Sequence, residues 1–228
     1  MTALAAPAVQ AGRLFRFYHA DGDEIFALCD VSVSIDPGEI VAVVGPSGSG
    51  KSTLMSLVAG LDDPSGGTVH LNGQPISHRP DAERASLRRR HVGILYQSDN
   101  LFAHLTVAEN VELIAYLTGR PGWPARSLLD QVGLELRARS LPSELSGGEL
   151  ARAGLAVALA AGPTLLIADE PTGELDSTSE ASLLELLRRE ASNGTAIIIA
   201  THSPRVTAFA DRVIHLEDGR LTAERVLL

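Results

Sequence analysis

Apolar residues form unbroken runs at three places in the chain and alternate with polar residues at one. The alternation over 31–35 predicts a half-buried strand, and the Pro-Gly pair at 37–38 predicts a turn after it. The runs 40–44, 165–168 and 196–200 have no polar face, which is typical of parallel strands covered on both sides. We therefore expect a mainly parallel sheet between layers of other elements.

Shorter signals predict the elements around this sheet. Residues 53–59 are apolar enough for a buried helix, and Gly60 stands where a C-terminal cap would close it. Residues 68–71 followed by Asn72-Gly73 predict a strand and a tight hairpin turn, so an antiparallel piece should lie beside the main sheet. Residues 91–96 predict one further short strand.

The pattern changes to helical spacing between 102 and 162, with an interruption at 119–124 that is rich in Gly and Pro. We interpret this stretch as an inserted helical lobe. A last helix should lie between the two final apolar runs, with a capping box at 177–180 and a left-handed end at Asn193-Gly194. This alternation defines an α/β fold.

We treat residues 1–228 as a single domain. The expected division is a core with a β subdomain, made of about 1–97 and 163–228, and a helical subdomain of about 98–162. The Ala-rich, uncharged start at 1–12 lacks the basic residue of a secretory signal, so we expect a frayed terminus.

Composition and charge exclude several classes of protein. Of 228 residues, 45% are hydrophobic and 21% charged, which argues against a disordered or collagen-like chain. The net charge of −9 disfavours nucleic-acid binding, and the run Arg88–Arg90 is best explained as a solvated helix face. The lone Cys29 can form no internal disulfide. The longest uncharged stretch, 153–168, is interrupted by Gly162-Pro163, so we expect no membrane span.

A phosphate-binding loop follows the first buried strand. The sequence matches G-x-x-x-x-G-K-[ST], with the strand before it and the helix after it that this motif requires. Glycines let backbone N–H groups point at phosphates, the lysine reaches the terminal phosphates, and the following serine can bind Mg²⁺. The predicted nucleotide-binding residues are Gly45, Pro46, Ser47, Gly48, Ser49, Gly50, Lys51, Ser52 and Thr53.

Two adjacent carboxylates end the second buried run. Asp169 is expected to hold the magnesium shell and therefore to stay ionised. Glu170, at the strand end, is positioned to accept a proton from an attacking water. Together with the phosphate loop, this pair predicts phosphoryl chemistry.

Residues 145–149, Leu-Ser-Gly-Gly-Glu, resemble the signature motif of the ATP-binding-cassette (ABC) ATPases, a family of the P-loop NTPase fold with a RecA-like core. Ser146, Gly147, Gly148 and Glu149 offer a hydroxyl and N–H groups at a helix start, which is a second anion site. In that family the site closes over the γ-phosphate held by another chain. The resemblance therefore implies a head-to-tail dimer around two MgATP, expected to be a homodimer.

The same resemblance assigns further positions. Tyr18 matches the aromatic residue that stacks on adenine, with Phe15, Phe17 and Phe26 as nearby competitors. Gln97 matches the glutamine that senses Mg²⁺ and γ-phosphate, and 173–176 matches the loop that touches the opposite subunit. His202 matches the switch histidine at the γ-phosphate. The expected catalytic set is Lys51, Gln97, Glu170 and His202, and the expected metal ligands are Ser52, Gln97 and Asp169.

Two positions depart from the family pattern. Ser203 stands where an Asp usually follows the switch histidine, and Val157 stands where the helix after the signature usually has Arg. Neither departure replaces a group that contacts ATP in the family pattern. We therefore expect an active ATPase. The two departures bear on its regulation and its dimer contacts.

Residues 18–24, 105–111 and 141–144 resemble the lipoprotein-releasing and macrolide-exporter branch of the family. This resemblance implies a transport ATPase at the cytoplasmic face of the membrane, bound to an integral membrane permease on a separate chain. The segment 98–102 would form the groove for that permease, with Leu101 and Phe102 as apolar anchors, or else a mobile loop. The alternative is a soluble ABC ATPase in translation or DNA repair.

Overall fold

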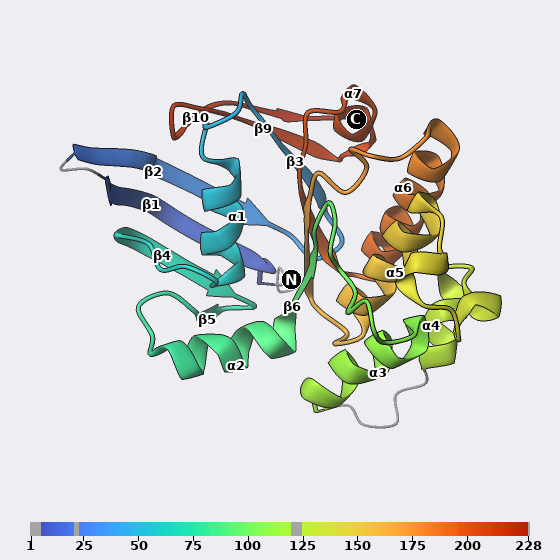
Figure 1. Cartoon of the computed structure of the whole chain (residues 1–228). Coiled ribbons are helices and arrows are strands. Elements are labelled where there is room, and N and C mark those ends of the chain that lie inside the picture. Colours follow the sequence, from blue (N-terminus) through green and yellow to red (C-terminus); the bar gives the residue numbers. More distant parts are fainter. Residues whose placement is uncertain (1–5, 21–22, 120–124, 228) are drawn as a thin grey trace, which may run out of the picture.

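Two sheets and a group of helices make up the computed structural model, which describes residues 6–20, 23–119 and 125–227 (Figure 1). The larger sheet has six strands in the order β10-β9-β3-β8-β7-β6. All its neighbours are parallel except β9 and β10, which are antiparallel. The strands are β3 (Ile40–Val44), β6 (Val92–Leu95), β7 (Leu165–Asp169), β8 (Ala196–Ala200), β9 (Arg212–Glu217) and β10 (Arg220–Val226).

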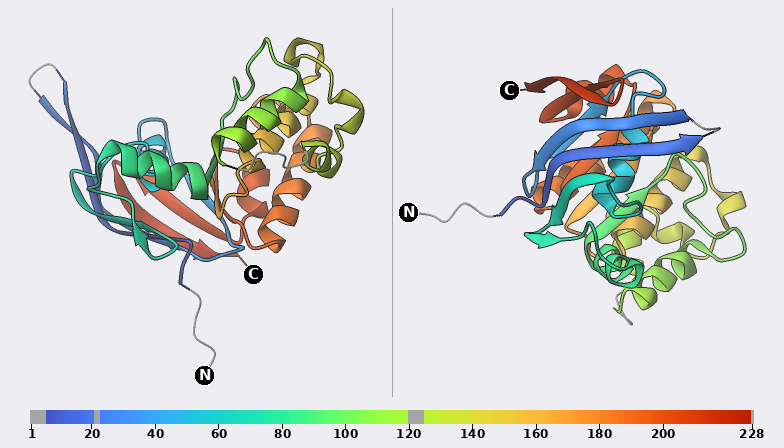
Figure 2. Two further views of the ribbon diagram at one scale, coloured as in Figure 1. Left: turned by 90° about the horizontal axis from the view of Figure 1, so that it is seen from below. Right: turned by 90° about the vertical axis from the view of Figure 1, so that its left-hand side faces the viewer.

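The smaller sheet is antiparallel throughout and has the order β2-β1-β4-β5. Its strands are β1 (Val9–Ala20), β2 (Asp23–Ile35), β4 (Gly66–Leu71) and β5 (Gln74–Pro75). The predicted turn between β4 and β5 is confirmed, since Asn72 and Gly73 both have left-handed φ values, of 49° and 75°. The long β1-β2 hairpin extends away from the helices in the views of Figure 2.

Both faces of the parallel strands are buried, as their unbroken apolar runs predict. In β3, Ile40 and Ala42 face the helices, whereas Val41 and Val43 face α1 and the antiparallel sheet. The helical side carries α3 (Val107–Leu117), α4 (Ala125–Gln131), α5 (Gly147–Leu159), α6 (Ser177–Ser192) and α7 (Pro204–Phe209). The other side carries α1 (Lys51–Ala59), with α2 (Asp81–His91) at its edge.

The α/β prediction and the mainly parallel core are confirmed, and two local predictions are corrected. The predicted frayed start at 1–12 is wrong from Val9 onward, because Val9 and Ala11 are buried in β1. Residues 1–5 lie outside the described part. The cap of α6 is Asp176, whose carboxylate accepts from the N–H groups of Thr178 and Ser179. The predicted capping box is therefore wrong.

Other elements extend beyond what the apolar pattern indicates. The predicted strand at 31–35 is only the end of β2, and β9, β10 and α2 were not predicted at all. The predicted helix ends are confirmed, since Gly60 and Gly194 both have positive φ values, of 69° and 99°. Of the predicted interruption at 119–124, residues 120–124 lie outside the described part.

Candidate active site

The phosphate loop joins the end of β3 to the start of α1 and is held by its own backbone. Lys51 Nζ donates to the carbonyl oxygens of Gly45 and Pro46, at 2.8 and 2.9 Å. Gly50 has φ 101°, and a Cβ there would lie 2.4 Å from the carbonyl oxygen of Ala27. Only glycine fits at this close approach of two backbone segments. The contact with Ala27 holds the phosphate loop at the N-terminus of α1.

A cavity of about 650 Å³ surrounds this loop and brings most of the predicted residues together. The phosphate loop, the carboxylates after β7 and the histidine after β8 all reach it. Its lining residues are Ile25, Phe26, Ala27, Gly45, Pro46, Ser47, Gly48, Gly50, Lys51, Ser52, Thr53, Asp169, Glu170 and His202. Ser49 is the one predicted loop residue that does not line it, because its side chain is buried beneath the loop.

Glu170 and His202 form a hydrogen-bonded pair at the carboxyl ends of two adjacent parallel strands. His202 Nδ1 lies 2.7 Å from Glu170 Oε1, and the His202 backbone N–H donates to Glu170 Oε2 at 3.4 Å. Strands β7 and β8 are parallel neighbours, so both residues leave the sheet at the same edge. The carboxylate is thereby aimed into the cavity beside the phosphate loop.

The charges of Glu170 and Lys51 both act on the carboxyl group of Asp169. Burial raises the pKa of its carboxyl group above the usual value, the Glu170 charge raises it further, and Lys51 lowers it. A cation placed here would reverse this balance by favouring the ionised form. The Lys51 charge is therefore not enough to offset burial and the Glu170 charge at Asp169.

Within the described part of the chain, no cluster of three or more His, Cys, Asp or Glu side chains can hold a metal ion on its own. Mg²⁺ commonly takes only one or two protein ligands, with waters and substrate phosphates completing its octahedral shell. Ser52 and Asp169 line the same cavity and supply oxygen donors of that kind. The site thus fits Mg²⁺ that arrives with a nucleotide.

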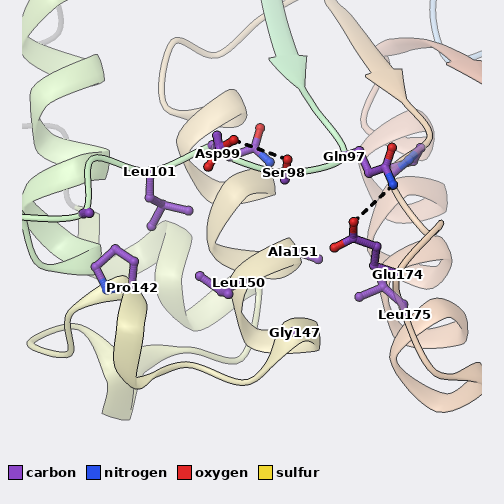
Figure 3. A pocket seen from close by; sticks show the side chains of 13 residues that line it. Gln97, Ser98, Asp99, Leu101, Pro142, Gly147, Leu150, Ala151, Glu174 and Leu175 are labelled. Carbon is purple, nitrogen blue, oxygen red and sulfur yellow. Dashed lines mark hydrogen bonds between the residues drawn. The ribbon is translucent and has the colours of Figure 1, made fainter.

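Gln97 lies beyond β6, outside the main cavity. Its side-chain amide donates to Glu174 Oε1 at 3.3 Å, as Figure 3 shows. It also shares with Asp169 a smaller adjoining hollow. The structure therefore places Gln97 near the predicted metal ligand but bonded to the loop at 173–176.

The signature residues lie elsewhere on the chain. Ser146 caps α5, and its hydroxyl and backbone N–H both donate to Glu149 Oε2, at 3.0 and 2.8 Å. These bonds and the one from Arg137 lower the pKa of Glu149 to about 2. None of the four residues from Ser146 to Glu149 lines the phosphate-loop cavity. Within one chain the two anion-binding motifs are therefore separate.

Tyr18 is likewise not part of the cavity wall. Its hydroxyl donates to Asp62 Oδ2 at 3.1 Å, and the Arg16 guanidinium lies 4.5 Å from its ring centroid. Ile25, its cross-strand partner in the β1-β2 hairpin, does line the cavity, together with Phe26. Strand β2 is the part of the site that sequence reasoning missed, although Phe26 stood among the competitors for the adenine contact.

A second hollow, of about 340 Å³, opens between the loop after β6 and the start of α5 (Figure 3). Leu101, Leu150 and Leu175 give it apolar walls, and Asp99 and Glu174 are its charged residues. Of the two anchors predicted for a partner, Leu101 lines this groove. Phe102 does not, and this residue is 52% exposed.

The fold and the site define a phosphate-loop ATPase in which the phosphate loop and the signature motif lie apart on one chain. The model of the ABC transporter family matches residues 28–173, and the chain belongs to this family. It is an ABC ATPase cassette, as its signature motif predicts.

Two bacterial relatives cover almost all of the chain. The chain is 42% identical over 220 residues to the lipoprotein-releasing system ATP-binding protein LolD of Bordetella pertussis. This match covers 94% of this chain and 95% of that protein. The chain is 43% identical over 227 residues to the macrolide export ATP-binding/permease protein MacB of Burkholderia pseudomallei, covering 98% of this chain. The chain spans only 35% of the length of that relative.

A solved structure shows the same fold. The ATP-binding cassette MJ0796, in a dimeric post-hydrolysis state bound to ADP and Pi, superposes with a TM-score of 0.89 at 34% identity. The match covers 96% of this chain and 99% of that one. Among the described residues, no helix is both long and apolar enough to cross a bilayer.

Proposed function

We propose that the chain is the ATP-hydrolysing subunit of a transporter, that two copies close around two MgATP, and that they drive a permease on a separate chain. One observation carries this proposal: the cavity holds Lys51, Glu170 and His202, but none of the signature residues. A second copy, placed head to tail, would supply the missing signature motif. The dimeric cassette MJ0796, bound to ADP and Pi, supports this arrangement.

In this function the phosphate loop binds and orients the nucleotide. The N–H groups at the start of α1 and the Lys51 ammonium neutralise the β- and γ-phosphates. To reach the phosphates, the Lys51 ammonium gives up its hydrogen bonds to the carbonyl oxygens of Gly45 and Pro46. Ser52 and Asp169 would hold Mg²⁺, with Gln97 completing the set from the adjoining hollow. The bound ion supplies Lewis-acid stabilisation of the phosphate charge.

Glu170 is the proposed general base. Its carboxylate accepts a proton from the water that attacks the γ-phosphate, while His202 holds the carboxylate through Nδ1 and contacts the phosphate. The pair acts only when water and nucleotide are aligned, and closure of the second copy would complete that alignment.

Residues of about 98–162 form the proposed helical subdomain, and the remainder forms the core and the β subdomain. This division places Gln97 at the junction and the Leu101 groove beside it. A permease segment docked in the groove would contact Gln97 and Glu174 directly, which connects transport to the site. A permease docked in this way would hold the chain at the cytoplasmic face of a membrane.

The names of both relatives support a membrane partner of this kind. One is a lipoprotein-releasing system ATP-binding protein, and the other joins ATP-binding and permease functions. The cargo of this chain would then be a lipoprotein, a peptide or a drug-like molecule handled by the permease.

The test is affinity purification of a tagged Glu170→Gln chain from its native membranes with MgATP present. The proposal expects an integral membrane permease, with two cassettes per complex by mass measurement. Untagged membranes serve as the control for non-specific recovery. Recovery of ribosomes or of soluble proteins alone would refute the transporter assignment and favour a soluble ABC ATPase.

A further inference from the structure

The buried carboxylate of Glu180, in the first turn of α6, forms hydrogen bonds with the loop that carries His202. Glu180 is only 9% exposed, and each of its oxygens has a partner. The Ser203 hydroxyl donates to Oε1 at 3.1 Å, and the Arg205 guanidinium donates to Oε2 at 2.9 Å. Arg205 also donates to the carbonyl oxygen of Ser177 in the same turn, at 3.3 Å. The loop and the helix are therefore joined by charge-assisted bonds.

The His202 imidazole ring makes few contacts of its own. Its side chain is 79% exposed, and its one polar contact in the described structure is the bond from Nδ1 to Glu170. An exposed ring with one hydrogen bond takes its position from the backbone that carries it. The ring position is therefore sensitive to any change in the loop.

That backbone is fixed on both sides of the histidine. Thr201 is fully buried, and its hydroxyl accepts a bond from the Ser203 N–H at 3.0 Å. On the other side, the Ser203 side chain bonds to Glu180 and also caps α7. In this bond the Ser203 hydroxyl is the donor and the Glu180 side-chain oxygen is the acceptor.

We propose that Glu180 is a positioning residue for ATP hydrolysis, which acts through Ser203 to hold the His202 imidazole against Glu170. Glu180 does not line the phosphate-loop cavity and has no contact with nucleotide in this role. The proposal also explains why a hydroxyl suits position 203 in this chain. An aspartate at this position would set a second negative charge against a buried carboxylate, and the two would repel each other.

The first experiment observes His202 directly and needs neither nucleotide nor partner. Histidine ¹⁵N labelling of the full chain gives signals for seven residues, and His202→Gln assigns the relevant one. Glu170→Ala provides the reference for a ring that has lost its Nδ1 bond. In Glu180→Ala the His202 signal should move toward that reference, while the other six histidine signals stay in place and report an intact fold.

Ser203→Ala is the second variant, because it removes only the hydroxyl and carries the test if Glu180→Ala does not fold. The control is Glu185→Ala, on the exposed side of the same helix, where the carboxylate makes only a 3.8 Å contact with Arg189. An unchanged His202 signal in both test variants would overturn the proposal. The same displacement in Glu185→Ala would also overturn it.

Kinetics give the second readout. A displacement of about 1 Å at a catalytic group can cost on the order of 100-fold in rate, so Glu180→Ala should lower kcat by about 10- to 100-fold. KM for ATP should stay within about twofold, since the phosphate loop lies on other elements. Ser203→Asp should lower kcat in the same way.

The paired variant Ser203→Asp/Glu180→Gln should recover most of that loss, because the amide introduced at position 180 would then donate to the carboxylate introduced at position 203. Values of kcat within twofold of wild type in Glu180→Ala and Ser203→Asp would refute the positioning role. A paired variant that is no faster than Ser203→Asp alone would do the same.

Discussion

Replacement of Glu170 by Gln removes the ability of this side chain to accept a proton and keeps its shape and its hydrogen bond to His202. Gln has nearly the same shape, and its amide oxygen can still accept the bond from His202 Nδ1, which spans 2.7 Å in the wild type. The backbone at this position has φ 47°, and the strain of this conformation is similar for Glu and Gln. The fold and the nucleotide cavity should therefore remain as they are.

The expected loss follows from the role of a positioned general base. Such a group contributes about 10²- to 10⁴-fold to the rate, which corresponds to about 3–5 kcal/mol in the activation free energy. KM for ATP should change little, since Lys51 and the phosphate loop are untouched. The substitution also removes a charge that raises the pKa of Asp169, so that pKa should fall and Asp169 should stay ionised to lower pH.

Phosphate release at saturating MgATP, with the purified chain, measures this effect. Glu185→Gln is the matched control, because it makes the same chemical change on the exposed side of α6 and should keep wild-type turnover. Nucleotide binding, followed with a fluorescent ATP analogue, should be equal in all three proteins. A Glu170→Gln chain that retains more than a third of the wild-type turnover would refute the assignment of the base.

Three further changes test other parts of the site. Gly50→Ala should weaken nucleotide binding more than tenfold in a fluorescence titration, because its Cβ would meet a carbonyl oxygen at 2.4 Å. Gly48 has a positive φ of 80° as well, but a Cβ there meets nothing within 4 Å, so Gly48→Ala carries the backbone strain without the clash and should bind better than Gly50→Ala. Glu149→Gln should lower the free energy of unfolding measured in urea. The pKa of Glu149 is lowered from 4.5 to about 2, so its stabilising effect is full above pH 4.5 and is lost as the pH falls toward 2; a difference that persists unchanged at pH 2 would contradict this. Tyr18→Ala should raise the Kd for ATP about tenfold and Tyr18→Phe only slightly if the ring stacks on adenine, and equal affinities for all three proteins would refute that contact.

The residue pattern by itself determined the chemistry and the central sheet. The apolar runs of β3, β7 and β8 predicted parallel strands buried on both faces, since no polar face was left for solvent. The phosphate loop and the Asp169-Glu170 pair were also readable, because each needs particular residue types at fixed local spacing. Such signals depend only on near neighbours in the chain.

Several elements without a continuous apolar run were not predicted. Charged residues interrupt the short apolar segments of β9 and β10, and α2 has a single buried residue, Leu87. Neither the two strands nor the helix therefore has a strong hydrophobic pattern. Their places are determined by pairing and packing with residues distant in sequence. The same is true of β2, which supplies Ile25 and Phe26 to the cavity wall.

Only the tertiary structure decided which predicted residues meet. Glu170 and His202 are 32 residues apart and come within 2.7 Å because β7 and β8 are parallel neighbours. The structure also assigned Glu180 to Ser203 and Arg205 instead of to a capping box, since the buried carboxylate bonds across to α7. Helix capping follows from local sequence, but a contact between two elements depends on how the whole chain packs.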